Sequence, residues 1–216
     1  MVKLRAENGW YLPYSPEAGC VRDFAFALTT HRVFAAVEQG GLLRSDDDGE
    51  TWHLARGSSG KTGSQPEGFI HPDVHSVAAH PWSPNLVFAP TGGGLFRSED
   101  GGETWEHVYH CYCRAVWPDP AEAKHLVFGP ADGVDRNGRI ESTFDGGGTW
   151  EKASGGLDVP WSSHMVERLL RVDQELLAVL SNGEFLAAPL MTLQWRHILP
   201  NAGWVRAVAT MNVQSG

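Results

Sequence analysis

The sequence predicts an all-β protein assembled from a repeated hairpin unit. Three segments share the pattern S/T-x-D-x-G-x-T-W: residues 45–52 are SDDDGETW, residues 98–105 are SEDGGETW and residues 143–150 are TFDGGGTW. Short strand-like runs flank each segment, such as GGLFRS and TWEHVY around the second copy. The 216 residues also include 25 Gly, 13 Pro and 9 Trp, a composition typical of a turn-rich β protein and not of a helical bundle or a disordered chain.

Length and charge exclude several classes of protein. A chain of 216 residues suits one core, so we expect a single domain over residues 1–216. With 17 Lys and Arg against 26 Asp and Glu, the formal net charge is -9, which argues against a nucleic-acid partner. No apolar run is long enough to span a bilayer, and the start MVKLRAENGW lacks the apolar stretch of a secretory signal. We therefore expect a cytoplasmic protein without a membrane partner.

Three cysteines give no sign of a cross-linked framework. Their number is odd, and the close pair Cys111 and Cys113 is C-x-C where zinc ribbons have C-x-x-C. We therefore expect reduced thiols at these two positions and at Cys20.

The residue types of the repeated segment suit a tight turn between two strands. An Asp can accept hydrogen bonds from the turn backbone, a Gly can adopt a positive φ, and a Trp buries a large surface beside the next element. We therefore assign a structural role to the shared positions of the three copies. They are Ser45, Asp47, Gly49, Trp52, Ser98, Asp100, Gly102, Trp105, Thr143, Asp145, Gly147 and Trp150.

These segments resemble the Asp-box, or bacterial neuraminidase (BNR), repeat. With their flanking strands, the three matches cover about residues 20–155. The resemblance implies a sialidase-like β-propeller, similar to WD40/YVTN/BNR-like repeat proteins of bacteria, in which the box joins the two outer strands of a blade on the face away from the active site. The family includes sialidases, xyloglucan-degrading hydrolases, sortilin-type receptors and a photosystem assembly factor. It therefore implies a fold and no single activity.

The elements follow in order along the chain. The strands beside the boxes are 40–45 and 51–55, then 93–98 and 104–109, then 138–143 and 149–153. Trp52, Trp105, Trp150 and Trp195 are spaced by 53, 45 and 45 residues, which suits blades of four strands. In the fourth unit, Asn182-Gly183 predicts a hairpin within residues 176–189, although the turn before Trp195 has lost the Asp and Gly.

The count of blades depends on both chain ends. A fifth inner strand is predicted over residues 204–210, and residues 3–13 could supply outer strands to the same blade. We therefore expect five blades, the last one composite. A ring of four blades, or a fragment of a protein with six or seven, are the alternatives.

The openings of the inner strands place five polar residues around one axis. In a propeller, these strands begin at the rim of the central channel. Successive side chains of a strand point to opposite sides, so the second residue of each strand faces the channel if its neighbours pack between blades. The first four residues of the five predicted inner strands are VRDF, VHSV, CRAV, VERL and VRAV. These second residues are Arg22, His75, Arg114, Glu167 and Arg206.

Two kinds of site fit these residues. The three arginines could hold a carboxylate or phosphate through forked hydrogen bonds, or could instead tie blades together with Asp23 and Glu167. Loops just upstream add further histidines, and imidazole and carboxylate ligands suit zinc, iron or manganese. The alternative is that the histidines bond loop carbonyls in a wet channel. The candidate ligands of a divalent metal are His71, His75, His110, His164 and Glu167.

The predicted function is binding of a small anionic or sugar-like ligand at the channel mouth. The contacts would come from Arg22, Arg114, Arg206, His71, His110 and His164. If the protein is an enzyme, glycosyl hydrolase-like or lyase chemistry would suit these groups, with His75 or Glu167 moving the proton. The F/Y-R-I-P motif of sialidases is absent and no Tyr–Glu pair can be assigned, so we expect no sialidase activity. The competing hypothesis is a non-enzymatic scaffold that binds a protein partner.

Overall fold

The computed structural model describes residues 2–12, 14, 20–200, 203–205 and 208. In this part of the chain, four antiparallel sheets of four strands follow one another, and within each sheet the strands lie in sequence order. We call the sheets blades one to four. The predicted all-β class and the four-stranded blade are confirmed.

The strands have the following bounds. Blade one contains β1 (Val21–Phe26), β2 (Val33–Val37), β3 (Gly41–Ser45) and β4 (His53–Leu54). Blade two contains β5 (Ala78–His80), β6 (Ser83–Thr91), β7 (Gly94–Ser98) and β8 (Glu106–Tyr109). Blade three contains β9 (Tyr112–Pro118), β10 (Leu126–Ala131), β11 (Glu141–Thr143) and β12 (Glu151–Lys152). Blade four contains β13 (Val166–Val172), β14 (Glu175–Leu180), β15 (Phe185–Pro189) and β16 (Arg196–His197).

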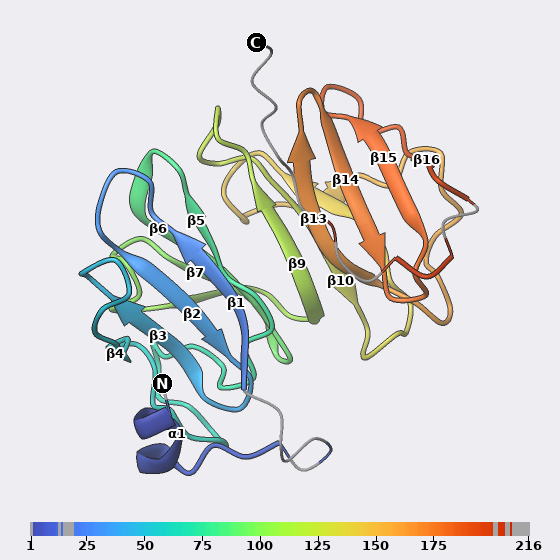
Figure 1. Ribbon diagram of the computed structural model, residues 1–216. Coiled ribbons are helices and arrows are strands. Elements are labelled where there is room, and N and C mark those ends of the chain that lie inside the picture. Colours follow the sequence, from blue (N-terminus) through green and yellow to red (C-terminus); the bar gives the residue numbers. More distant parts are fainter. Residues whose placement is uncertain (1, 13, 15–19, 201–202, 206–207, 209–216) are drawn as a thin grey trace.

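The core lies between the blades. The central strands β2, β6, β10 and β14 are apolar on both faces, so each blade can pack on a neighbour at either side. Phe34 and Trp105 belong to the cluster between blades one and two, and Phe88 and Phe128 to the cluster between blades two and three. Trp195 belongs to the cluster between blades three and four. Figure 1 shows the resulting arc, with the innermost strands β1, β5, β9 and β13 on its concave side.

The boxes lie at the blade ends that are remote from the openings of the inner strands. The box beginning at Ser45 joins β3 to β4, and the other two boxes join β7 to β8 and β11 to β12. Asp47 accepts hydrogen bonds from the backbone N–H and the hydroxyl of Thr51, at 2.8 and 2.5 Å, and from the Ser45 hydroxyl at 2.7 Å. Gly49 has a φ of 92°, which only glycine adopts readily. The local chemistry therefore closes this turn as the residue types predict.

The N-terminal segment differs from the prediction. Residues 3–13 were expected as outer strands, but Val2–Asn8 form the helix α1, in keeping with its Lys, Leu, Arg, Ala and Glu residues, which favour a helix. After the helix, Trp10 and Leu12 pack on the outer face of blade one, and the Trp10 indole N–H donates to the Gly60 carbonyl at 2.8 Å. Figure 1 shows α1 beside the lower end of blade one, and residues 2–12 add no strand to that blade.

The fifth blade remains a prediction. Most of the run 204–210, including Arg206, lies outside the described residues. Its described residues, Trp204, Val205 and Val208, lie beside blade four, where the Val205 N–H donates to the Gly183 carbonyl at 3.2 Å. Among the helices that the structure describes, none is long and apolar enough to cross a membrane.

Candidate functional site

Three of the four inner strands carry a backbone irregularity at the residue predicted to face the channel. In β1, Arg22 is an extra residue, because Val21 and Asp23 pair with consecutive residues of β2. In β13, Glu167 is an extra residue in the same way. In β9, Arg114 lies within a two-residue segment that opposes one residue of β10. Such β-bulges bend a strand and change the direction of a side chain, so the backbone itself sets the direction of these three side chains.

Blade two has the corresponding feature just before β5. The N–H groups of His75 and Ser76 both point to the Pro90 carbonyl, at 3.0 and 3.5 Å, so two residues again oppose one. The Ser76 hydroxyl donates to the Arg114 carbonyl at 2.7 Å, which fixes blade two against blade three at this level. All four blades therefore present one polar side chain from the same register position.

The four side chains meet in one cavity of about 160 Å³, which we call the mouth. It is lined by Arg22, Glu38, His75, Arg114, Glu167 and Arg168. Three arginines face two glutamates, so the charged lining carries an excess of one positive charge. The mouth is therefore a polar, charged site at which blades one to four come together.

Two ion pairs organise the mouth. Arg22 donates to Glu38 within blade one, and Arg114 of blade three donates to Glu167 of blade four. The hydrogen bond with Glu38 is the main reason why the pKa of Arg22 is raised. Burial works against the charge of Arg114, but the attraction of Glu167 and of Tyr112 outweighs it and raises the pKa of Arg114. Both guanidinium groups therefore stay charged and fixed in direction.

Tyr112 connects Arg114 to His75. Its hydroxyl accepts hydrogen bonds from Arg114 Nε and Nη2 at 3.2 and 3.0 Å, and it lies 3.4 Å from His75 Nε2. Burial is the main cause that raises the pKa of Tyr112, so the phenol keeps its proton at neutral pH. That proton is free to point toward His75, because the guanidinium group only donates.

His75 is held from both sides. Its Nδ1 lies 2.9 Å from the Cys113 carbonyl, and its Nε2 lies 3.3 Å from Asp73 Oδ2. A histidine between a carboxylate and a carbonyl is well placed to hold or transfer a proton. Burial acts to raise the pKa of Asp73, but His75, His71 and Arg22 together lower it. Asp73 therefore remains an ionised carboxylate behind the mouth.

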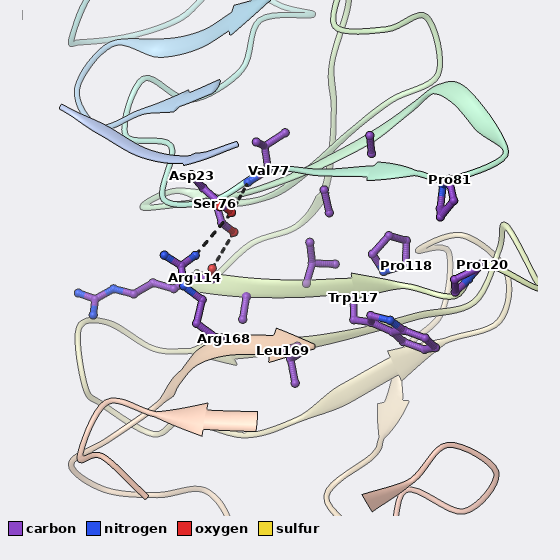
Figure 2. A pocket seen from close by; sticks show the side chains of 14 residues that line it. Asp23, Ser76, Val77, Pro81, Arg114, Trp117, Pro118, Pro120, Arg168 and Leu169 are labelled. Carbon is purple, nitrogen blue, oxygen red and sulfur yellow. Dashed lines mark hydrogen bonds and ion pairs between the residues drawn. The ribbon is translucent and has the colours of Figure 1, made fainter. Parts of the chain in front are cut away.

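A second cavity of about 280 Å³ extends from the mouth between β5, β9 and β13, and shares Arg114 and Arg168 with it. We call it the groove. Figure 2 shows these two arginines at one end, and Trp117, Pro118 and Pro120 toward the other. The groove therefore changes from a charged end at the mouth to apolar walls farther along.

Among the described residues, the three other histidines predicted for the site do not line the mouth. His71 lies behind it, where its Nδ1 accepts a hydrogen bond from the Asp73 N–H at 3.2 Å. His110 contacts the ring of His107, with centroids 3.8 Å apart, and His164 stacks on Trp161. The structure therefore brings together four of the predicted residues, Arg22, His75, Arg114 and Glu167, and separates these three histidines from them.

Sequence reasoning missed Glu38 and Asp73. Glu38 directly follows the buried strand β2, and its backbone N–H donates to the Cys20 carbonyl at 2.8 Å, which places it beside the opening of β1. Asp73 lies in the string HPDVH between two histidines that were singled out. A charged residue at the end of an otherwise apolar central strand is the signal that could have identified Glu38.

Comparison with known proteins identifies the class. A family model described as the BNR/Asp-box repeat matches residues 43–54, which contain the first box. This match shows that the chain contains a BNR/Asp-box repeat, and its four blades have the arrangement of a β-propeller. No curated protein sequence matches the chain.

Several solved structures are similar to the chain. An ancestral GH74 enzyme has a TM-score of 0.66 at 20% identity, covering 85% of this chain and 24% of the enzyme. The GH74 xyloglucanase from Xanthomonas campestris has a TM-score of 0.58 at 17% identity, covering 80% of this chain and 29% of the enzyme. YCF48 bound to D1 peptide has a TM-score of 0.57 at 18% identity, covering 84% of this chain and 55% of YCF48. The chain thus spans about a quarter of the GH74 enzymes and about half of YCF48, and these similarities show the fold alone.

Proposed function

We propose that the protein is a binding module that holds a small anionic or sugar-like ligand at the mouth. The observation that carries this proposal is the mouth itself, because bulges of four successive blades aim charged or imidazole side chains into one cavity. Gathering this many charges in one place costs solvation free energy, which a packed apolar channel would avoid. Binding of a ligand that hydrogen-bonds to these charged groups would explain why they are gathered in one cavity.

The charge and size of the mouth favour a ligand end that carries one negative charge. Its volume of about 160 Å³ equals roughly five water molecules at ~30 Å³ each, enough for a carboxylate with a few carbons or for part of one sugar ring. Of the three arginines that line the mouth, Arg168 has the weakest ion pair within the protein. Its side chain is 47% exposed, and its ion pair with Asp23 is long, at 3.5 Å. A carboxylate entering the mouth can pair with Arg168 without breaking the shorter pairs of Arg22 and Arg114.

Sugar hydroxyls also fit, because each hydroxyl both donates and accepts. Adjacent arginine and glutamate side chains, such as Arg114 and Glu167, offer a donor and an acceptor side by side. The structural similarity to a xyloglucanase supports this second chemical type. An acidic sugar would combine both features.

Thermal shift and calorimetry with a panel of short carboxylic acids, neutral monosaccharides and uronic acids test the proposal. A ligand that binds only the folded state raises the melting temperature. Arg168→Gln should weaken binding about tenfold, which corresponds to the loss of about 1.4 kcal/mol from one charge-assisted hydrogen bond. Arg196→Gln is the matched control, since Arg196 is 52% exposed and pairs with Glu175 on the outer edge of blade four. Equal weakening by both variants, or no response to the panel, would contradict the proposal.

A protein partner is the second candidate function. Phe24, Phe26 and Leu28 are 46%, 64% and 69% exposed, and they alternate along one face of β1 and the residues after it. Exposed apolar rows on an edge strand are common at protein contacts. The similarity to YCF48, solved with a D1 peptide, supports a peptide or protein partner. A partner on this face should lose affinity in Phe26→Ser and keep it in Arg168→Gln, and a ligand at the mouth should show the reverse pattern.

A further inference from the structure

Three ligand-type side chains of blades one and two converge beside the mouth. Glu38, Asp73 and His75 each offer one ligand atom, and these atoms lie within 4.8 Å of one another. His75 Nε2 and Asp73 Oδ2 are already 3.3 Å apart. Around a four-coordinate divalent ion with bonds of about 2.0 to 2.2 Å, neighbouring ligand atoms lie about 3 to 4 Å apart. Small side-chain movements therefore suffice to bring all three atoms onto one ion.

One oxygen of this cluster is buried and without a hydrogen-bond partner. The side chains of Glu38, Asp73 and His75 are only 10%, 19% and 8% exposed. Asp73 Oδ2 faces His75, whereas Asp73 Oδ1 accepts no hydrogen bond from the described residues and is shielded from solvent. A buried, ionised carboxylate with one oxygen that lacks a donor is costly, and a cation bound to the same carboxylate would offset its negative charge.

The orientation of His75 suits a ligand. A carbonyl oxygen only accepts, so the contact of 2.9 Å between His75 Nδ1 and the Cys113 carbonyl places a proton on Nδ1. In the neutral imidazole, the lone pair then lies on Nε2, which faces Asp73 and the cluster. Metal-binding histidines typically donate their other N–H to a carbonyl or a carboxylate in this way.

The charge and donor set also suit a divalent ion. Two carboxylates and one imidazole match the charge of such an ion. Arg22 and the Tyr14 hydroxyl each contact one oxygen of Glu38, but a carboxylate oxygen has two lone pairs and can accept a second interaction. Two oxygen donors with one nitrogen donor favour zinc, manganese or iron(II) over a soft ion such as copper(I).

We propose that Glu38, Asp73 and His75 form a binding site for one divalent transition-metal ion beside the mouth. The site shares only His75 with the ligand set expected from the sequence. It goes beyond the proposed ligand binding and does not depend on it, because metal binding can be measured without any organic ligand. The competing arrangement is a protonated His75 that forms an ion pair with Asp73 and leaves no place for a metal.

Titration of the full chain with zinc or manganese tests the site. The protein is stripped with a chelator, titrated by calorimetry, dialysed and analysed by plasma mass spectrometry. We expect about one equivalent of metal in the wild type, and affinity reduced at least tenfold in Asp73→Asn and His75→Ala. Asp119→Asn is the matched control: Asp119 Oδ2 lies 2.8 Å from His125 Nδ1, and these side chains, 20% and 9% exposed, have nearly the same burial as Asp73 and His75. This variant should bind like the wild type.

Three results would overturn the site: no binding to the wild type, unchanged binding in both cluster variants, or an equal loss in Asp119→Asn. Circular dichroism shows whether each variant is folded. If the cluster variants unfold, the absorption spectrum of the cobalt(II)-loaded wild type tests the proposed ligands instead. Visible ligand-field bands without a near-ultraviolet thiolate band support oxygen and nitrogen ligands, whereas a thiolate band or no bound cobalt contradicts the proposal.

Discussion

Asp23 of β1 and Arg168 of β13 form an ion pair, with 3.5 Å between Asp23 Oδ2 and Arg168 Nη1, that joins the inner strands of blades one and four. The same oxygen accepts a hydrogen bond from the Val77 N–H of blade two at 3.4 Å. One carboxylate thus contacts two other blades beside the channel. Burial raises the pKa of Asp23, and Arg168 and two backbone N–H groups offset this only in part.

The raised pKa gives the first prediction, for Asp23→Asn. Since the folded-state pKa lies above the unfolded value of about 3.9, Asp23 favours the folded state below pH 4, and this contribution disappears as the pH rises through the folded-state pKa. At pH 7 the variant, which lacks the buried charge, should be at least as stable as the wild type in urea unfolding. A loss of more than about 1 kcal/mol would show that the pair with Arg168 outweighs the desolvation of Asp23.

Asp47 should have the opposite dependence on pH. Hydrogen bonds from the Thr51 hydroxyl and N–H and from Ser45 lower the pKa of Asp47 to about 2. Its contribution is therefore present above pH 4 and is lost as the pH falls from about 4 to 2. Urea midpoints measured between pH 2 and 6 should fall less steeply toward low pH in Asp47→Asn than in the wild type. Parallel curves for the two proteins would contradict this assignment.

Asp100→Ala tests whether the box acts only on folding. Asp100 accepts hydrogen bonds from the Glu103 and Thr104 N–H groups at 3.0 and 2.9 Å, and from the Thr104 hydroxyl at 2.6 Å. Leaving these donors without a partner should cost about 1 to 3 kcal/mol of unfolding free energy. Ligand affinity at the mouth should be unchanged, because the box lies at the other end of the blade. A change in affinity without a change in stability would refute the structural role, and exposed Asp158→Ala is the control.

Trp10→Ala tests the observed role of the N-terminal segment. Trp10 is 6% exposed and packs with Leu12 on blade one. Removing a buried indole should cost about 3 to 5 kcal/mol, measured by urea unfolding. Tyr11→Ala is the control, since the neighbouring Tyr11 side chain is 57% exposed and its removal should cost little. Equal effects of both variants would mean that the segment does not stabilise blade one.

The fold could be predicted from the sequence because its signals are local. The turn of the box that begins at Ser45 is held by hydrogen bonds between residues no more than four positions apart. The sequence of the box therefore predicts the turn directly. The hairpin of blade four was likewise visible as Asn182-Gly183, and Gly183 has a φ of 84°. The N-terminal helix was not predicted, because the expectation of a composite closing blade assigned strands to residues 3–13, whereas residues 2–8 carry helix-forming residues.

The mouth could be predicted only in part. Arg22 and Glu167 stand at the same place in a repeated string, so their common direction follows from the repeat. Asp73 is two positions from His75 in the sequence, but Glu38 comes near them only because blades one and two pack together, and no spacing within the sequence encodes that approach. His164 was grouped with the mouth by its place before an inner strand, but its ring stacks on Trp161 of its own loop.

The four bulges make the mouth a modular surface. Each blade contributes one residue, Arg22, His75, Arg114 or Glu167, from an equivalent backbone position, while the boxes that close the blades lie at the opposite ends. Replacing one of these four residues changes one of the six side chains that line the mouth and leaves the turn of every box intact. Evolution or protein design can therefore vary the residues at these four positions in combination. Such changes can alter ligand specificity while the β-propeller scaffold stays the same.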